Sequence, residues 1–178
     1  MADYAGQAYG DQGDSLIMKV TPQNLEAEQS LLGGALTSEQ ARTEIGGLEK
    51  TDFYDQANGL IYDAVRQLMS MGKPVDILST ADFLEHQGQL QVCGGIAYLA
   101  SLADKTLYLN NTAEYVAMIR EKSLLRRILA FAEGLTKSCY SGQETSDELL
   151  SLMAERVMNL RGSLERQALV PMHEILSL

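Results

Sequence analysis

The chain has 178 residues, of which 46% are hydrophobic and 21% charged, a composition that suits one ordinary domain with a substantial core. Its formal charge of −10 disfavours tight binding to nucleic acid by this chain alone. No apolar run approaches the roughly 18 residues of a membrane span, and the N-terminus lacks the pattern of a signal peptide. We therefore expect a cytoplasmic protein without membrane contact.

Residues 1–20 are rich in glycine and aspartate and show no helical apolar spacing, so a disordered tail is expected there. From Thr21 onward the apolar residues recur at helical intervals, which predicts a first helix over residues 23–36. A capping box over residues 37–40 starts a second helix that runs to about Leu48.

Three more short helices follow before residue 108. An apolar stripe over residues 60–69 predicts a third helix that ends at Gly72. Asp76 can cap a fourth helix through about His86, and a fifth lies near residues 96–103. Because no segment shows strand alternation, the fold class is all-α, and residues 21–108 form a compact bundle of about five short helices.

The pattern changes beyond residue 109, where helical spacing continues without a breaker for nearly 30 residues. Gly142 ends this long helix, and a capping box over residues 145–148 starts another. Two helices joined by so short a turn must lie antiparallel, so residues 109–166 form a long helical hairpin. Its apolar positions include Ile119, Leu125, Ile128, Leu149, Met153, Val157 and Leu160.

A long hairpin has more apolar surface than one partner helix can bury. The leftover stripe can be covered by another copy of the chain or by another protein, or it can fold back on the bundle. The sequence pattern leaves these alternatives open.

The chemistry of the sequence offers no catalytic centre. There is no phosphate-binding GxxxxGK[ST] motif, and the two cysteines and two histidines stand apart. Asp76, Asp82 and Glu85 could share a helix face as a metal-dependent hydrolytic site, although a solvated face is the simpler interpretation.

A basic cluster stands out on the long helix, formed by Arg120, Lys122, Arg126 and Arg127. It could be a solvated outer face, a docking surface for an acidic neighbour, or a nucleic-acid contact. The last is weakened by the lack of interleaved aromatic residues.

Four blocks in a characteristic order carry a resemblance to a known family. They are PQNLEAEQSLLGG at 22–34, DFY at 52–54, GKPVD at 72–76 and GGIAYL at 94–99, and IREKSLLRR at 119–127 and VPMHEIL at 170–176 follow. The set resembles the N-terminal domain of DnaB-type bacterial replicative helicases, with residues 167–178 similar to the start of the family's linker helix.

The resemblance implies a non-catalytic collar domain of a hexameric helicase, in which hairpins pair subunits into a trimer of dimers. It also implies docking of the C-terminal domain of a DnaG-type primase during DNA replication, with a helicase loader as a further candidate partner. No cofactor is expected in this chain, because ATP and Mg²⁺ belong to a separate motor domain of the parent helicase. The alternative is a freestanding truncated relative that regulates or caps helicase hexamers.

Positions carried over from the family's primase contact are Tyr98, Leu129, Leu135 and Glu26. A tyrosine suits such a site because its ring supplies apolar area while its hydroxyl stays hydrogen-bonded. Each of the first three could instead be a core residue. Glu26 could simply lie near its helix N-terminus, where a carboxylate interacts favourably with the helix dipole.

Overall fold

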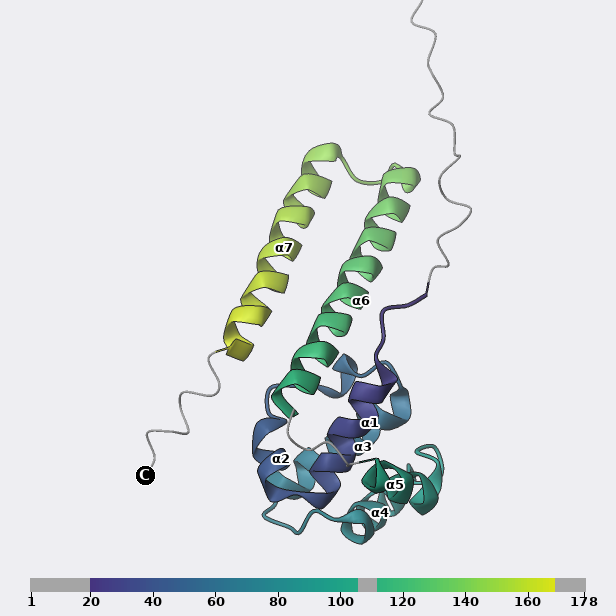
Figure 1. Cartoon of the computed structure of the whole chain (residues 1–178). Coiled ribbons are helices and arrows are strands. Elements are labelled where there is room, and N and C mark those ends of the chain that lie inside the picture. Colours follow the sequence, from purple (N-terminus) through teal and green to yellow (C-terminus); the bar gives the residue numbers. More distant parts are fainter. Residues whose placement is uncertain (1–19, 106–111, 169–178) are drawn as a thin grey trace, which may run out of the picture.

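A computed structural model describes residues 20–105 and 112–168, with side chains up to residue 162. Within these ranges the chain is entirely helical (Figure 1), which confirms the all-α class. The elements are α1 (Leu25–Thr37), α2 (Glu39–Glu44), η1 (Lys50–Asp52), α3 (Gln56–Ser70), α4 (Ile77–His86), α5 (Gly95–Asp104), α6 (Thr112–Ser141) and α7 (Ser146–Ala168). The predicted tail, apart from Val20, and residues 169–178 of the predicted linker helix lie outside the described residues. The helix of the hairpin continues through Ala168, beyond the predicted boundary at 166.

Local capping sets several helix boundaries. The side chain of Asn24 accepts from the backbone N–H of Ala27 at 3.0 Å, so α1 begins at Leu25 rather than at residue 23. Ser38, not Thr37, caps α2, because Thr37 is the last residue of α1 and its hydroxyl donates to the carbonyl of Gly33. The second helix also ends at Glu44, four residues earlier than expected.

Other predicted caps are confirmed. Asp76 accepts from the N–H of Ser79 at 2.7 Å at the start of α4. Ahead of α7, the carboxylate of Glu148 accepts from the N–H of Thr145 at 2.8 Å, while the Thr145 hydroxyl accepts in return from the N–H of Glu148 at 3.3 Å. The start of the second helix of the hairpin is therefore fixed by local chemistry.

The core of the bundle surrounds α1, which contacts α2, α3, α5 and α6. Leu32 on α1 and Tyr62 on α3 are both 0% exposed. The Tyr62 hydroxyl donates to the carbonyls of Ile45 and Leu48, each at 3.0 Å, which anchors the connection between α2 and η1. Burial raises the pKa of Tyr62 to about 12.

The short helix η1 was not predicted from the sequence. It packs against α3 at Gly59, where a Cβ atom would lie 2.5 Å from the carbonyl oxygen of Lys50. Only glycine permits this close approach. The contact brings Asp52, at the end of η1, into the interior beneath α6.

The helix α6 belongs to both parts of the molecule. Its first turns contribute Val116 and Ile119 to the bundle core. The remainder extends away from the bundle, and α7 returns beside it in the opposite direction (Figure 1). At 1.5 Å per residue the full helix is about 45 Å long. Among the described helices, only α7 lies beside its distal half (Figure 1).

Candidate interaction surface on the helical hairpin

The distal half of the hairpin carries the most concentrated exposed apolar surface among the described residues. No described side chain of α7 is fully buried, and Met158 remains 75% exposed. The large hydrophobic residues exposed on the two helices are Ile128, Leu129, Tyr140, Leu150, Leu152, Met153, Val157 and Met158. Isolated exposed apolar residues are common, but so many on two adjacent helices are typical of an interaction site.

The predicted oligomerisation residues separate into three groups. Ile128, Met153 and Val157 are exposed. Leu125, Leu149 and Leu160 are half-buried. Ile119 is only 1% exposed and belongs to the chain's own core, so its assignment to the hairpin surface was wrong. The same helical period runs along α6, and only the packing of its first turns against the bundle distinguishes core from surface.

A buried carboxylate fixes the hairpin to the bundle. Asp52 is 2% exposed, and its Oδ1 accepts from the Ser123 hydroxyl and from the Arg127 guanidinium, each at 2.6 Å. Its Oδ2 accepts from the backbone N–H of Glu49 at 2.8 Å. Charge-assisted bonds of this kind are stronger than neutral ones, so these contacts define the orientation of α6 on η1.

Neighbouring arginines extend this attachment. Arg126 donates to the carbonyls of Asp52 and Pro22, and its guanidinium lies 5.9 Å from the centre of the Tyr54 ring. Burial lowers the pKa of Arg126, while the charges of Glu28 and Asp52 oppose that shift. Arg120 donates to the carbonyl of Gly46 at 3.1 Å.

The basic cluster was interpreted as a solvated face, a docking surface or a nucleic-acid contact. None of these describes Arg120, Arg126 and Arg127. They bind the bundle of their own chain, through partners more than 70 residues away in sequence. The acidic partner, Asp52, lies in the DFY block at 52–54, but no local sequence pattern connects it with α6.

A second buried network lies around Tyr98. Glu28 is 2% exposed and accepts from the N–H groups of Tyr54 and Asp55, at 2.7 and 3.3 Å, and from the amide of Asn58 at 2.9 Å. The Tyr98 hydroxyl donates to Asn58 Oδ1 at 2.8 Å and accepts from Gln29 at 3.3 Å. Burial is the main cause that raises the pKa of Tyr98.

The four predicted primase-contact residues do not form one compact patch. Tyr98 is half-buried on α5, with its hydroxyl already bonded inside the bundle. Glu26 is exposed in the first turn of α1. Leu129 and Leu135 lie on the extended part of α6, away from α5 (Figure 1), where Leu129 is 47% exposed and Leu135 is half-buried.

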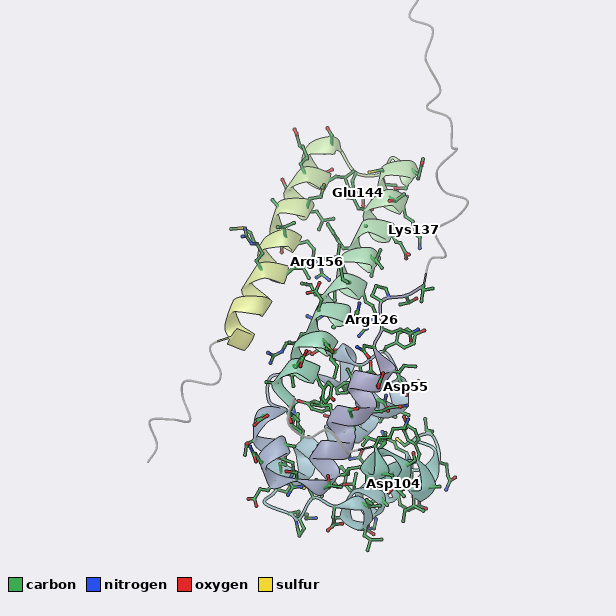
Figure 2. All side chains as sticks on the ribbon, viewed as in Figure 1. Asp55, Asp104, Arg126, Lys137, Glu144 and Arg156 are labelled. Atoms are coloured by element: carbon green, nitrogen blue, oxygen red, sulfur yellow. The ribbon has the colours of Figure 1, made fainter. Side chains whose placement is uncertain are left out.

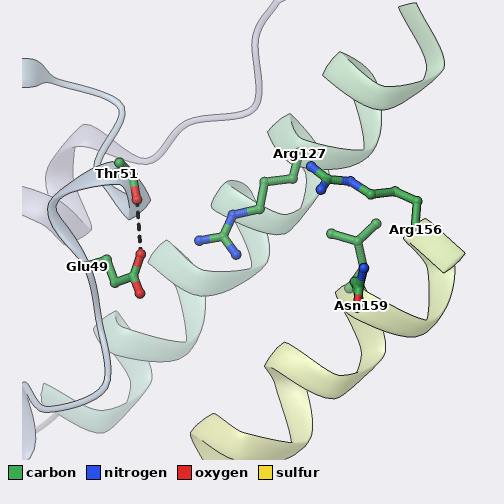
Figure 3. A pocket seen from close by; sticks show the side chains of 6 residues that line it. Glu49, Thr51, Arg127, Arg156 and Asn159 are labelled. Carbon is green, nitrogen blue, oxygen red and sulfur yellow. Dashed lines mark hydrogen bonds between the residues drawn. The ribbon is translucent and has the colours of Figure 1, made fainter. Parts of the chain in front are cut away.

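A groove lies where the bundle meets the hairpin (Figure 3). Glu49 and Thr51 line one wall, Arg127 comes from α6, and Arg156 and Asn159 come from α7, with Leu160 beside them. Because Arg127 is already paired with Asp52 and Glu49 contributes a negative charge, the groove is electrostatically mixed. This mixed lining does not make a pocket selective for an anion.

The carboxylates on α4 do not assemble a metal site. Asp76 is used as a helix cap, and the hydrogen bond from the Ser79 N–H is the main cause that lowers its pKa. The Oδ2 atom of Asp82 lies 3.7 Å from Nε2 of His86, one turn further along the same helix. Among the described residues no group of three or more His, Cys, Asp or Glu side chains could hold a metal ion.

Two other features bear on the kind of site present. No helix in the described ranges is long and apolar enough to span a membrane. Cys93 is buried, whereas Cys139 is exposed near the hairpin turn.

Comparisons with known proteins agree with this architecture. Residues 20–121 match the family model described as the DnaB-like helicase N terminal domain. The replicative DNA helicase DnaB of Pasteurella multocida is 35% identical over 133 residues, which are 73% of this chain but 28% of that protein. The protein of the same name from Mycobacterium leprae is 36% identical over 127 residues, covering 71% of this chain and 21% of the relative. The chain therefore spans less than a third of these curated relatives.

Solved structures extend the likeness to three dimensions. The crystal structure of the N-terminal domain of DnaB helicase from Mycobacterium tuberculosis aligns with a TM-score of 0.73 and 31% identity, over 79% of this chain and 99% of that one. A DnaB-like replicative helicase, studied for its interactions with primase, shares the fold with a TM-score of 0.64 and 22% identity over 77% of this chain and 31% of that one. The helical bundle, the hairpin and the sequence match together show that this chain belongs to the family of DnaB-like helicase N-terminal domains.

Proposed function

We propose that this domain is an assembly and docking module of a replicative DNA helicase and has no catalysis of its own. The observation that carries the proposal is the row of exposed apolar residues along both helices of the hairpin. A second copy of the chain is the natural cover, because a self-complementary face closes a symmetric pair. Three such pairs would build the collar of a hexamer.

Primase docking is the second part of the proposed function. It is supported by Leu129, a large leucine left 47% exposed, and by the fold shared with a helicase known for its interactions with primase. The C-terminal domain of a DnaG-type primase is the proposed partner, with Leu135, Tyr98 and Glu26 as further contacts. A helicase loader could share this surface.

The remaining activities are assigned to a longer parent protein. DNA unwinding, together with ATP and Mg²⁺ binding, would belong to a motor domain outside this chain, and the parent would act in the cytoplasm. We propose little direct nucleic-acid binding by this domain, since its formal charge is −10 and the arginines on α6 are engaged within the chain.

Self-association can be tested with Val157→Glu. Val157 is 49% exposed on α7, so the isolated domain should still fold, but a paired hairpin would bury the new charge. We expect light scattering to give a dimer or larger species for the unmodified chain and a monomer for the variant. Leu78→Glu is the matched control, because Leu78 is exposed on α4. A monomeric unmodified chain at high micromolar concentration would remove the basis of the proposed pairing.

Primase docking can be tested separately with Leu129→Glu. A carboxylate buried in the interface without a partner should weaken binding by about 2 kcal/mol, or roughly 30-fold in Kd. Calorimetric titration with a primase C-terminal domain measures this change, and circular dichroism checks that the variant is folded. Unchanged affinity would exclude Leu129 from the proposed contact.

A further inference from the structure

One face of α7 carries exposed residues at intervals that are symmetric about its middle. At 3.6 residues per turn these residues fall within an arc of about 80° around the helix. They form what we call the outer stripe of α7, which consists of Asp147, Leu150, Ala154, Met158 and Arg161, all of them exposed. The intervals between them are three, four, four and three residues. Leu150 and Met158 are 61% and 75% exposed, so the apolar part of the stripe is open to solvent in the single chain.

The outer stripe lies away from α6. The half-buried leucines of α7 are Leu149 and Leu160, and α6 is the described helix that packs beside them (Figure 1). Both leucines lie roughly 130° around the helix from Ala154. The side chain of Arg156 also extends on the α6 side of α7 (Figure 2). No described element of the chain therefore covers the outer stripe.

We propose that the outer stripe pairs with the outer stripe of a second copy, antiparallel, about a two-fold axis beside Ala154. This inference rests on the proposed self-association of the hairpin and specifies its direction and register. In such a pair, a residue that precedes Ala154 meets the residue that follows it by the same number of positions. Leu150 then packs against the partner's Met158, and Asp147 lies opposite the partner's Arg161. The two-fold axis repeats each contact, so both occur twice.

The charges at the ends of the stripe favour the antiparallel direction. A parallel pair in register would place Asp147 against the partner's Asp147 and Arg161 against the partner's Arg161. The antiparallel pair replaces these two like-charge contacts with two opposite-charge contacts. Exposed ion pairs contribute little affinity by themselves, so their role is to select the direction, while burial of Leu150 and Met158 drives association.

The spacing of the stripe also suits close packing of two helices. From Asp147 to Arg161 the intervals average 3.5 residues, which is the repeat of a left-handed coiled coil. The small side chain of Ala154 at the centre allows the helix axes to approach within about 8–10 Å. Because each bundle lies at the base of its own hairpin (Figure 1), an antiparallel pair places the two bundles at opposite ends of the joined hairpins.

Exchange of the two charges tests the direction. Asp147→Arg and Arg161→Asp each convert both ion pairs into like-charge contacts, so each variant alone should dimerise roughly tenfold more weakly. An equimolar mixture of the two variants restores both pairs between unlike chains, and it should return to the affinity of the unmodified chain. Sedimentation equilibrium measures these affinities. Arg156→Asp is the matched control, because Arg156 is an exposed arginine on the other side of α7, and it should leave the affinity unchanged.

Cysteine cross-linking tests the position of the axis. In a Cys139→Ser background, which removes the exposed native thiol, Ala154→Cys should form an intermolecular disulfide, because a residue at the axis meets its own copy. Leu150→Cys should not, since its two copies would lie about 12 Å apart along the helices, beyond the roughly 7 Å limit between bridged Cα atoms.

Two results would overturn this pairing and leave self-association standing. One is a dimer whose affinity neither charge variant changes, and the other is a disulfide through Leu150→Cys as readily as through Ala154→Cys, which indicates a parallel pair. If the charge variants left the dimer intact but weakened binding of a primase C-terminal domain, the outer stripe would belong to that partner instead. A monomeric unmodified chain would remove the proposed self-association itself.

Discussion

The bundle and the hairpin contain similar leucine-rich helices but use them differently. Leu32, in the centre of α1, is 0% exposed, whereas Leu152 on α7 is 46% exposed. In the bundle, several short helices cover one another, so each apolar stripe has a partner. In the described part of the hairpin, the two long helices have only each other along their distal halves. The comparison shows that helix length and connectivity, rather than composition, decide where apolar surface remains for assembly.

Truncating one leucine in each region should give the largest difference in the free energy of unfolding between the bundle and the hairpin. Leu32→Ala should lower the free energy of unfolding by about 3 kcal/mol, because the substitution leaves a cavity in a close-packed core. Leu152→Ala should change it by less than about 0.5 kcal/mol in the monomer. Urea denaturation monitored by circular dichroism measures both, at a concentration where the chain is monomeric. Equal losses would mean that α7 is buried in the monomer after all.

Removing the carboxylate that joins the two regions should have the next largest effect. Asp52→Ala leaves Arg127 and Ser123 at the base of α6 without their acceptor. We expect a loss of about 2 kcal/mol, less than for a fully buried pair, because Arg127 is partly exposed.

The same variant should loosen the angle between hairpin and bundle. Hydrogen exchange should increase in η1 and in the middle of α6 more than in α3. The matched control is Asp82→Ala, an exposed carboxylate on α4. Uniform exchange throughout the domain would argue that Asp52 supports global stability rather than the junction.

A smaller effect concerns the bundle alone and depends on pH. Burial raises the pKa of Tyr62 to about 12 from the ordinary tyrosine value of 10.0. Between these values the unfolded chain loses the tyrosine proton while the folded chain keeps it, so this contribution to stability is intact below about pH 10 and falls as pH rises toward 12.

Tyr62→Phe isolates this contribution. At neutral pH the variant should be less stable by about 1 kcal/mol, because two backbone carbonyls lose their hydroxyl donor. The difference between the two proteins should shrink as pH rises above about 10. Thermal unfolding from pH 7 to 11 measures the difference, and a constant gap would contradict the assigned pKa.

Much of the architecture could be predicted from local sequence. The capping residues Asp76 and Thr145, the glycine ends and the apolar periods identified the fold class and every α-helix in approximately the right place, because these interactions span only a few residues. The family resemblance was carried by short blocks of the same kind. The helix η1 was missed because it has only three residues and depends on Gly59, from another element.

What the sequence alone determined is therefore the series of helices and the amphipathic character of the hairpin. Only the tertiary structure decided that Ile119 belongs to the core, that Arg126 and Arg127 bind Asp52, and that Glu28 meets Asn58 and Tyr98. The physical reason is distance along the chain. Helical periodicity and capping are encoded over a few residues, whereas a buried charge finds its partner across dozens, and only packing brings the two together.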